Sequence, residues 1–328
     1  MRMTFRIFSN HVLRMWNRRN VIVITLLMTM AAVAFAVFFT SQIELKGNVA
    51  VVASTTASLP LDEKNYSVHY LEQAPLQSEL VRNKYDAVVT LERDGSYQIE
   101  TLKTDRFKEE LEQAIAGSDS AVPTKKKRSL QNSILGFLSM LLLVQALFYF
   151  QLFSDDKKTG TLRRTAVSPA GIAPYLIAQC LFGFLGVYAP AWLVLAITKG
   201  IGLDIGFSLG MYALLLIFPA LLAVSFALFI AAWIENADTG LSLASGIIII
   251  SSLLSGSFYK IDHQNGVMEA ISNVLPQKQF ILLVDGVEAH GTLLQNMGNG
   301  LYVIAVSLAL GVAGWFICRH RLYKGWYG

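Results

Sequence analysis

The sequence predicts an all-α polytopic membrane protein with six transmembrane helices and a small α+β insert. Three observations lead to this fold class. Of the 328 residues, 54% are hydrophobic and only 15% are charged, whereas a soluble domain carries about a quarter charged residues. The mean hydropathy of the chain is +0.48. The apolar residues are also gathered into six long runs rather than spread along the chain.

Each of the six runs is long enough to cross a bilayer, which takes about 20 largely apolar residues. The runs are 21–40, 134–153, 174–198, 207–233, 241–258 and about 300–318. Pro190 and Pro219 lie within the third and fourth runs. Because neighbouring helices can satisfy the carbonyl groups that a proline leaves free, we expect kinked spans at these places rather than broken ones.

The orientation follows from the lysines and arginines near the ends of the spans, which favour the cytoplasmic side. They precede the first span, separate the second from the third, and follow the sixth. These residues are Arg2, Arg6, Arg14, Arg18, Arg19, Lys157, Lys158, Arg163, Arg164, Arg319, Arg321 and Lys324. We therefore expect a multi-pass protein of the cell (plasma) membrane with both termini in the cytoplasm. The basic tract Lys125 to Arg128 disagrees, but long loops cross the membrane largely regardless of charge.

The sequence divides into three parts under this topology. Residues 1–41 form a cytoplasmic N-terminal segment and the first span, residues 42–130 an extracellular α+β domain, and residues 131–328 the other five spans. In the insert we expect strands at 48–54 and 66–72, a helix at 76–84, a hairpin from 85–92 and 96–103 around Asp94-Gly95, and a helix at 105–117.

The segment between the fifth and sixth spans is too long for a turn and too polar for a span. Two stretches within about 264–290 have the apolar spacing of one helix face, and Pro276 separates them. We expect two short helices on the outer leaflet. The alternative is an ordinary extracellular loop, which the unbroken apolar run 280–284 disfavours.

The interiors of the spans contain no Asp, Glu, Lys, Arg or His. Transporters coupled to ions or protons generally need such groups at membrane depth, so a self-powered secondary transporter is disfavoured. The chain also lacks the GxxxxGK[ST] phosphate-binding loop. Any uphill transport would therefore draw its energy from another chain. We find no pattern of a catalytic or metal site, and the net charge of +4 does not indicate nucleic-acid binding.

A charged connection, SDDKKTGTLRRTAVSPAG at 154–171, separates the second and third spans. It is longer than a plain turn. We interpret it as a short amphipathic helix along the inner membrane face, predicted over 155–165. Leu162 would face the spans, and the charged residues would meet another subunit.

Polar side chains inside the spans are few. Gln145 and Tyr149 lie on the second span, and Gln179 on the third. Such groups hydrogen-bond between helices, so packing is the first interpretation. The second interpretation is that the three residues contact a substrate and form part of its path.

The order of one span, an α+β insert and five further spans resembles the permease subunits of ATP-binding-cassette exporters of the ABC-2 type (type V-like). In that family an acidic residue, a Gly-Thr pair and a downstream Pro lie on a coupling helix after the second span, here about 154–170. KYDAVVTLERDGSYQIETL is similar to the family's insert, and LLSGSFYKI…ISNVLPQKQF…VDGV is similar to the segment after its fifth span. The chain departs from the pattern at SFYKI, where a Pro is usual, and at PQKQF, where an aromatic residue more often lies nearer the Pro.

The resemblance implies an exporter permease with no cofactor or catalytic site of its own. ATP and Mg would bind to cytoplasmic ATPase subunits, and a second permease copy or a sister chain would complete the pathway within the membrane lipid. Substrates would be amphipathic, such as antibiotics, antimicrobial peptides or lipids. The residues expected to contact the ATPase are Asp155, Asp156, Gly160, Thr161, Arg163, Arg164 and Pro169. The alternatives are a secondary transporter and a membrane-anchored extracellular sensor or assembly protein.

Overall fold

The computed structural model divides into two compact units. One combines Met1–Thr40 with Arg128–Gly328, and the other is Ser41–Lys127. The structure describes residues 2–41, 47–52, 66–71, 75, 85–91, 97–101, 108, 111–112, 115, 129–169, 171–257, 266–290 and 292–324.

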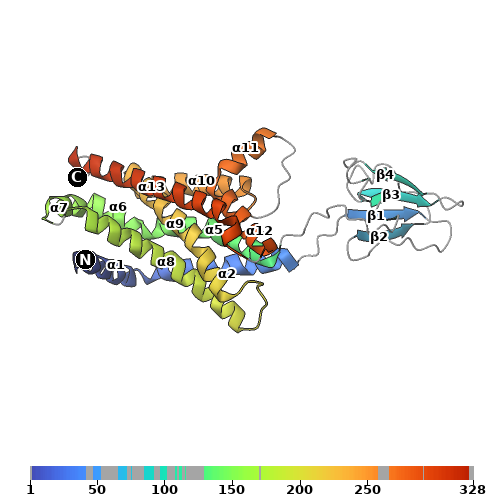
Figure 1. The fold of residues 1–328 in the computed structure, drawn as a ribbon, viewed down its shortest axis with the longest axis horizontal. Helices are drawn as coiled ribbons and strands as arrows, with labels where there is room; N and C mark the ends of the chain where they lie inside the picture. The colour runs from blue at the N-terminus through green and yellow to red at the C-terminus, as the bar shows by residue number, and fades with distance from the viewer. Residues whose placement is uncertain are drawn as a thin grey trace. The chain divides into compact units, whose positions relative to one another are not determined.

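The first unit is helical (Figure 1). Its elements are α1 (Arg2–Asn17), α2 (Arg19–Ser41), α5 (Leu130–Tyr149), α6 (Gln151–Lys158), α7 (Thr161–Val167), α8 (Ala173–Gly200), α9 (Leu209–Trp233), α10 (Ala237–Leu254), α11 (Gly266–Val274), α12 (Pro276–His290), the short η1 (Leu294–Asn296) and α13 (Met297–Tyr323). Six helices in the described part are long and apolar enough to cross a membrane, and they coincide with the six predicted spans. The predicted polytopic fold class is confirmed.

Side chains cap free backbone N–H groups at the start of some of the spans. Ser129 accepts a hydrogen bond from the backbone of Asn132 at the start of α5, and Ser208 accepts one from Met211 at the start of α9. The helices α8 and α9 run on through Pro190 and Pro219, as expected for prolines packed among neighbouring helices.

The helix α9 lies at the centre of the helical unit and packs against α13, α5 and α8. Its central position follows from an almost wholly apolar sequence that can be buried on every side. By contrast, α2, α10 and α13 keep most of their apolar surface exposed, which is the surface that lipid or another subunit covers in a membrane.

Three segments that are far apart in sequence lie at the same end of the helical unit: α1, α7 and the C-terminal end of α13 (Figure 1). The helices α11 and α12 confirm the prediction of two short helices separated at Pro276. The helix α12 packs against α13 and α5 through buried side chains such as Phe280 and Leu283. Its position at the outer leaflet stays a prediction.

The helix α1 was not predicted from the sequence. Residues 2–17 form a separate helix that packs against α8, with Met15 and His11 buried. The signal was present as Ile7, His11 and Met15 at intervals of four, but a histidine in the buried row and three arginines within the helix concealed it.

The second unit contains a four-stranded sheet in the order β2-β1-β3-β4. Its strands are β1 (Gly47–Val52), β2 (Tyr66–Leu71), β3 (Ala87–Leu91) and β4 (Tyr97–Thr101). All four predicted strands are confirmed, and β3 pairs with β4 antiparallel as the predicted hairpin requires. The sequence did not show that β1 runs parallel to both β2 and β3.

One face of the sheet carries a small apolar core. Val49, Val51 and Val89 pack there with Leu111 and Ile115, which have helical conformation within the predicted 105–117 helix. The alternation along β1 and β3 puts these valines on one side of the sheet. The expected 76–84 helix, the Asp94-Gly95 turn and the 125–128 tract lie outside the described residues.

Candidate functional site

The charged connection between the second and third spans forms two short helices rather than one. The helix α6 ends at Lys158, and α7 begins at Thr161. Between them Gly160 has a φ of +68°, a left-handed conformation that glycine adopts without strain. The prediction of a continuous helix over 155–165 is therefore wrong, because a helix cannot continue through this conformation.

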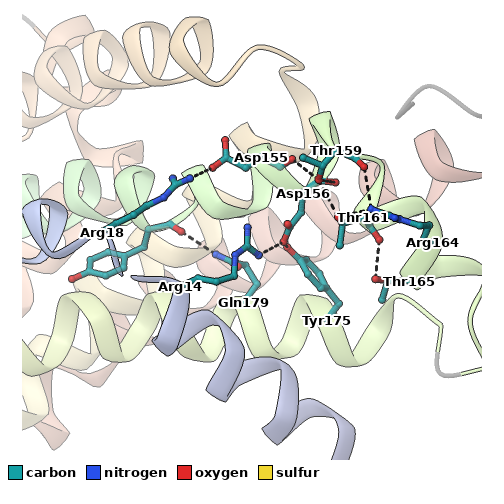
Figure 2. Close-up of polar contacts among 11 residues, drawn as sticks. Arg14, Arg18, Asp155, Asp156, Thr159, Thr161, Arg164, Thr165, Tyr175 and Gln179 are labelled. Carbon is teal, nitrogen blue, oxygen red and sulfur yellow. Dashed lines mark hydrogen bonds and ion pairs between the residues drawn. The ribbon is translucent and has the colours of Figure 1, made fainter. Parts of the chain in front are cut away.

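The carboxylate of Asp156 lies at the centre of a buried polar network (Figure 2). Its Oδ2 accepts a hydrogen bond from Arg14 Nη1 at 2.8 Å and another from the Tyr175 hydroxyl at 2.5 Å. Only 3% of Asp156 is exposed. The hydrogen bond to Asp156 raises the pKa of Arg14 above its usual value, so this arginine is charged. The network joins α6 to both α1 and α8.

A second ion pair repeats this link at the surface. Asp155 Oδ2 lies 2.7 Å from Arg18 Nη2, at the end of α1 (Figure 2). Both side chains are partly exposed, so solvent screens the interaction. The two neighbouring acids of the connection therefore both point toward arginines that precede the first span.

Lys157 points toward a different helix. Its ammonium group donates to the carbonyl oxygens of Ala231 at 2.5 Å and Ile234 at 2.7 Å, at the C-terminal end of α9. The last carbonyls of a helix have no partner within it and carry partial negative charge, which a lysine satisfies and neutralises. The side chain is almost fully buried.

Three consecutive residues thus attach α6 to three other helices. We call Asp155, Asp156 and Lys157, with their partners on α1, α8 and α9, the junction. Next to the junction in the sequence, Leu162 of α7 is fully buried in the main apolar core. This confirms the prediction that Leu162 faces the spans. A displacement of α6 and α7 would therefore move α1, α8 and α9 with them.

The remaining predicted contact residues lie around α7. Thr161 Oγ1 accepts a hydrogen bond from Arg164 Nη2 at 3.3 Å (Figure 2). Both residues belong to α7, which Gly160 precedes. Arg163, Arg164 and Pro169 are exposed. We expected all charged residues of the connection to face a partner. For Asp156 this expectation needs correction, because its carboxylate is enclosed by Arg14 and Tyr175.

The polar residues within the spans hold helices together. Gln145 Nε2 donates to the Thr25 carbonyl at 3.1 Å and to Thr29 Oγ1 at 3.0 Å, joining α5 to α2. The Tyr149 hydroxyl lies 3.3 Å from Thr25 Oγ1, and Gln179 Nε2 donates to the Tyr149 carbonyl at 3.1 Å. Gln145, Tyr149 and Gln179 are all buried, which favours packing over substrate contact.

His11 is a residue of this region that the sequence analysis missed. Its ring is buried, with the ring of Tyr175 at 5.3 Å and that of Phe182 at 5.8 Å between centroids. Burial lowers the pKa of His11 from 6.5 to about 4, although the negative charge of Asp156 acts in the opposite direction. The ring is therefore neutral at physiological pH and packs as an aromatic group beside the junction.

Comparison with protein families relates this geometry to a known class. The family model described as ABC-2 type transporter matches residues 113–288, which is more than half of the chain. The match includes α5 to α12 and therefore the acidic and basic residues of the junction on α6. The chain belongs to the ABC-2 type transporter family. Comparisons with curated proteins and with solved structures found no significant match.

Family membership confirms the resemblance that the sequence analysis identified. This ABC-2 protein is a multi-pass membrane protein and the transport permease component of an ATP-binding-cassette system. Permeases of this family associate with an ATP-binding-cassette ATPase.

Proposed function

We propose that this ABC-2 permease exports an amphipathic substrate, such as an antibiotic, an antimicrobial peptide or a lipid, from the cell. Two permease subunits, identical or sister chains, form the pathway. Separate ATPase subunits, which bind ATP and Mg, dock on the α6–α7 connection. Both termini and α7 face the cytoplasm, and the 42–130 domain lies outside the cell.

The junction is the observation that carries this proposal. An ATPase that pulls on α7 moves α6, and α6 is fixed to α1 and α8 through Asp156 and to α9 through Lys157. Buried hydrogen-bonded charges resist separation, because a charge that loses its partner in a low-dielectric site is costly. Motion at α7 can therefore pass to several helices as a rigid-body movement.

The distribution of charge within the spans supports an ATP-driven mechanism. Charged residues lie only near the ends of the six helices, for example Lys199 in α8 and Asp238 in α10. A coupled ion would need charged or strongly polar ligands at membrane depth. An ATPase that acts mechanically through α7 needs no such ligands.

The apolar surface of the helices supports an amphipathic substrate. A groove of about 380 Å³ lies between α2 and α5. It is lined entirely by apolar side chains: Met28, Ala31, Ala32, Phe35, Phe137, Met140 and Leu141. Methionines adapt their shape to different apolar groups. The apolar part of a substrate would enter this groove sideways, from the surrounding lipid.

Reconstitution tests the proposed energy source. The permease and its ATPase are placed in proteoliposomes without an ion gradient, and transport of a fluorescent amphipathic compound is followed after addition of ATP and Mg. We expect transport with ATP and none with a non-hydrolysable analogue. Transport driven by a sodium or proton gradient in vesicles that lack the ATPase would contradict the proposal.

Labelling of single cysteines tests the orientation. In a variant with Cys180 and Cys318 replaced by serine, a cysteine at Glu100 on β4 should react with a membrane-impermeant thiol reagent in intact cells. A cysteine at Arg163 on α7 should react only after the cells are opened. Both positions are exposed, so lack of reaction reflects the side of the membrane. The reverse pattern would overturn the topology.

A further inference from the structure

We propose that the ATPase recognises α7 through a cationic surface with one apolar residue, and that the partner presents acidic side chains around an apolar pocket. The docking surface consists of Lys158, Arg163, Arg164 and Val167. This inference rests on the proposed function and specifies the chemistry of its partner.

The junction determines the charge of the docking surface. The sequence of the connection contains both acids and bases, which would suit partners of either charge. In the structure Asp155 and Asp156 are turned toward Arg18 and Arg14, and Lys157 is buried against α9. Lys158, Arg163 and Arg164 are exposed, whereas Asp155 is only partly exposed and is paired with Arg18, so the fully exposed charges of the connection are basic.

The three basic residues of the docking surface are exposed, and no described carboxylate forms an ion pair with any of them. Arg164 Nη2 donates at 3.3 Å to the Thr159 carbonyl and to Thr161 Oγ1, which holds its guanidinium group beside the Gly160 turn. Three positive charges, on α7 and the adjacent end of α6, attract an acidic surface.

Val167 provides an apolar contact at the end of α7. It is 82% exposed, whereas Leu162 on the opposite side of the same helix is fully buried. Arg163 and Val167 are four positions apart and so share one face of the helix. An apolar side chain surrounded by charged groups matches the usual arrangement of a protein interface, with an apolar centre and a polar rim.

The composition of this surface favours a protein partner over the membrane. A helix that inserts into the headgroup region exposes several large apolar side chains, as α1 does with Phe5, Leu13 and Trp16. Val167 is the single large apolar side chain that α7 exposes. One valine fits a pocket on a protein but provides too little area to hold a helix in lipid.

The test measures binding between two purified components. The tagged permease is isolated from membranes of the organism that encodes it, and the ATPase that co-purifies is identified and produced separately. Its affinity is then measured for the permease in nanodiscs of phosphatidylcholine. We expect the Lys158→Glu/Arg163→Glu variant to bind at least about tenfold more weakly, because like charges across an interface repel each other.

Two further measurements separate the contributions. Val167→Ala should weaken binding about fivefold or more if the valine fills a pocket. The wild-type affinity should fall between about 50 mM and about 500 mM KCl, since salt screens exposed charges. Lys278→Glu on α12 reverses one charge outside the docking surface, half of the charge change in the double variant, and should bind like the wild type. Thermal unfolding of each variant checks that the fold is intact.

The outcomes distinguish this inference from the proposed function. If an ATP-binding-cassette ATPase binds all variants equally and independently of salt, the docking chemistry is wrong and the proposed function stands. If no such ATPase binds even the wild type, both fail. If the charge reversal weakens binding only in nanodiscs that contain phosphatidylglycerol, the surface recognises lipid headgroups and the inference is overturned.

Discussion

The guanidinium group of Arg14 lies 2.8 Å from the carboxylate of Asp156, although the two residues are 142 positions apart in the sequence. This pair joins the helix that precedes the first span to the helix that follows the second. Asp156 is buried and also accepts a hydrogen bond from Tyr175. Removal of Arg14 would therefore leave a buried carboxylate with a single donor.

We expect Arg14→Gln and Asp156→Asn each to lower the free energy of unfolding by about 2 kcal/mol, because each leaves a partly buried charge without its partner. The double variant should lose clearly less than the sum of the two, by about 1 kcal/mol or more, since the residues are in direct contact. Denaturant titration in detergent micelles measures all four forms. Strictly additive losses would show that the pair does not stabilise the protein as a unit.

Asp155 provides the matched comparison. It forms the same type of pair with Arg18, but both side chains are partly exposed. Surface pairs contribute about 0–1 kcal/mol, so Asp155→Asn should leave the stability nearly unchanged. It should also retain most ATP-driven transport, whereas Asp156→Asn should lose it. Equal effects of the two substitutions would mean that burial does not distinguish these acids.

The spans and the strands of the insert could be predicted from the sequence because their signals are local. A run of apolar residues as long as the bilayer is thick identifies a span wherever it occurs, and all six were identified. The segments 85–92 and 96–103 alternate like the strands of a hairpin within a few residues, which suffices to predict β3 and β4. Leu162 was likewise assigned to the buried side from the charged residues that surround it.

The junction could not be predicted, because each of its contacts joins distant parts of the chain. Nothing near Asp156 indicates that its partner precedes the first span, and Lys157 binds backbone carbonyls, which have no sequence signature. The parallel pairing of β1 with β2 and β3 is a long-range property of the same kind. Gly160 was noticed as part of a motif, but its left-handed conformation depends on where α6 ends.

The contact between Lys157 and α9 can be tested by comparison with the adjacent residue Lys158. Lys157→Met should lower the free energy of unfolding by about 1–3 kcal/mol, because the carbonyls of Ala231 and Ile234 lose their donor within the protein. Lys158→Met should leave the stability unchanged, since this side chain is exposed. The measurement is thermal unfolding in detergent. Similar losses in both variants would contradict the capping role.

The neutral ring of His11 predicts a loss of stability in acid. Its pKa in the folded protein is about 4, below the 6.5 of an unperturbed histidine. As the pH falls below 6.5 the unfolded chain takes up the proton first, so stability decreases between pH 6.5 and about 4. By pH 5.5 the loss from this residue should be about 1 kcal/mol.

The variant His11→Phe keeps a ring against Tyr175 and Phe182 but cannot be protonated. It should lose less stability than the wild type between pH 7.5 and pH 5.5, a range in which most carboxylates stay ionised. Thermal unfolding at the two pH values gives the difference. An identical pH dependence of the two proteins would show that His11 does not titrate as predicted.

Gly160 determines how α7 is oriented on α6. Its φ of +68° costs a residue with a β-carbon about 1–2 kcal/mol, and no heavy atom lies within 4 Å of the position that this carbon would occupy. Gly160→Ala should therefore act through the backbone alone. It should lower stability by about 1 kcal/mol and reduce ATP-driven transport more strongly, since relief of the strain turns the docking surface away from its partner.

Asparagine tolerates this conformation better, so Gly160→Asn should keep more of both stability and transport. Gly200 at the end of α8 has an ordinary helical conformation and equally open surroundings, so Gly200→Ala is the control, which should cause no loss of stability or transport. Equal behaviour of the alanine and asparagine variants at position 160 would show that the left-handed turn does not set the position of α7.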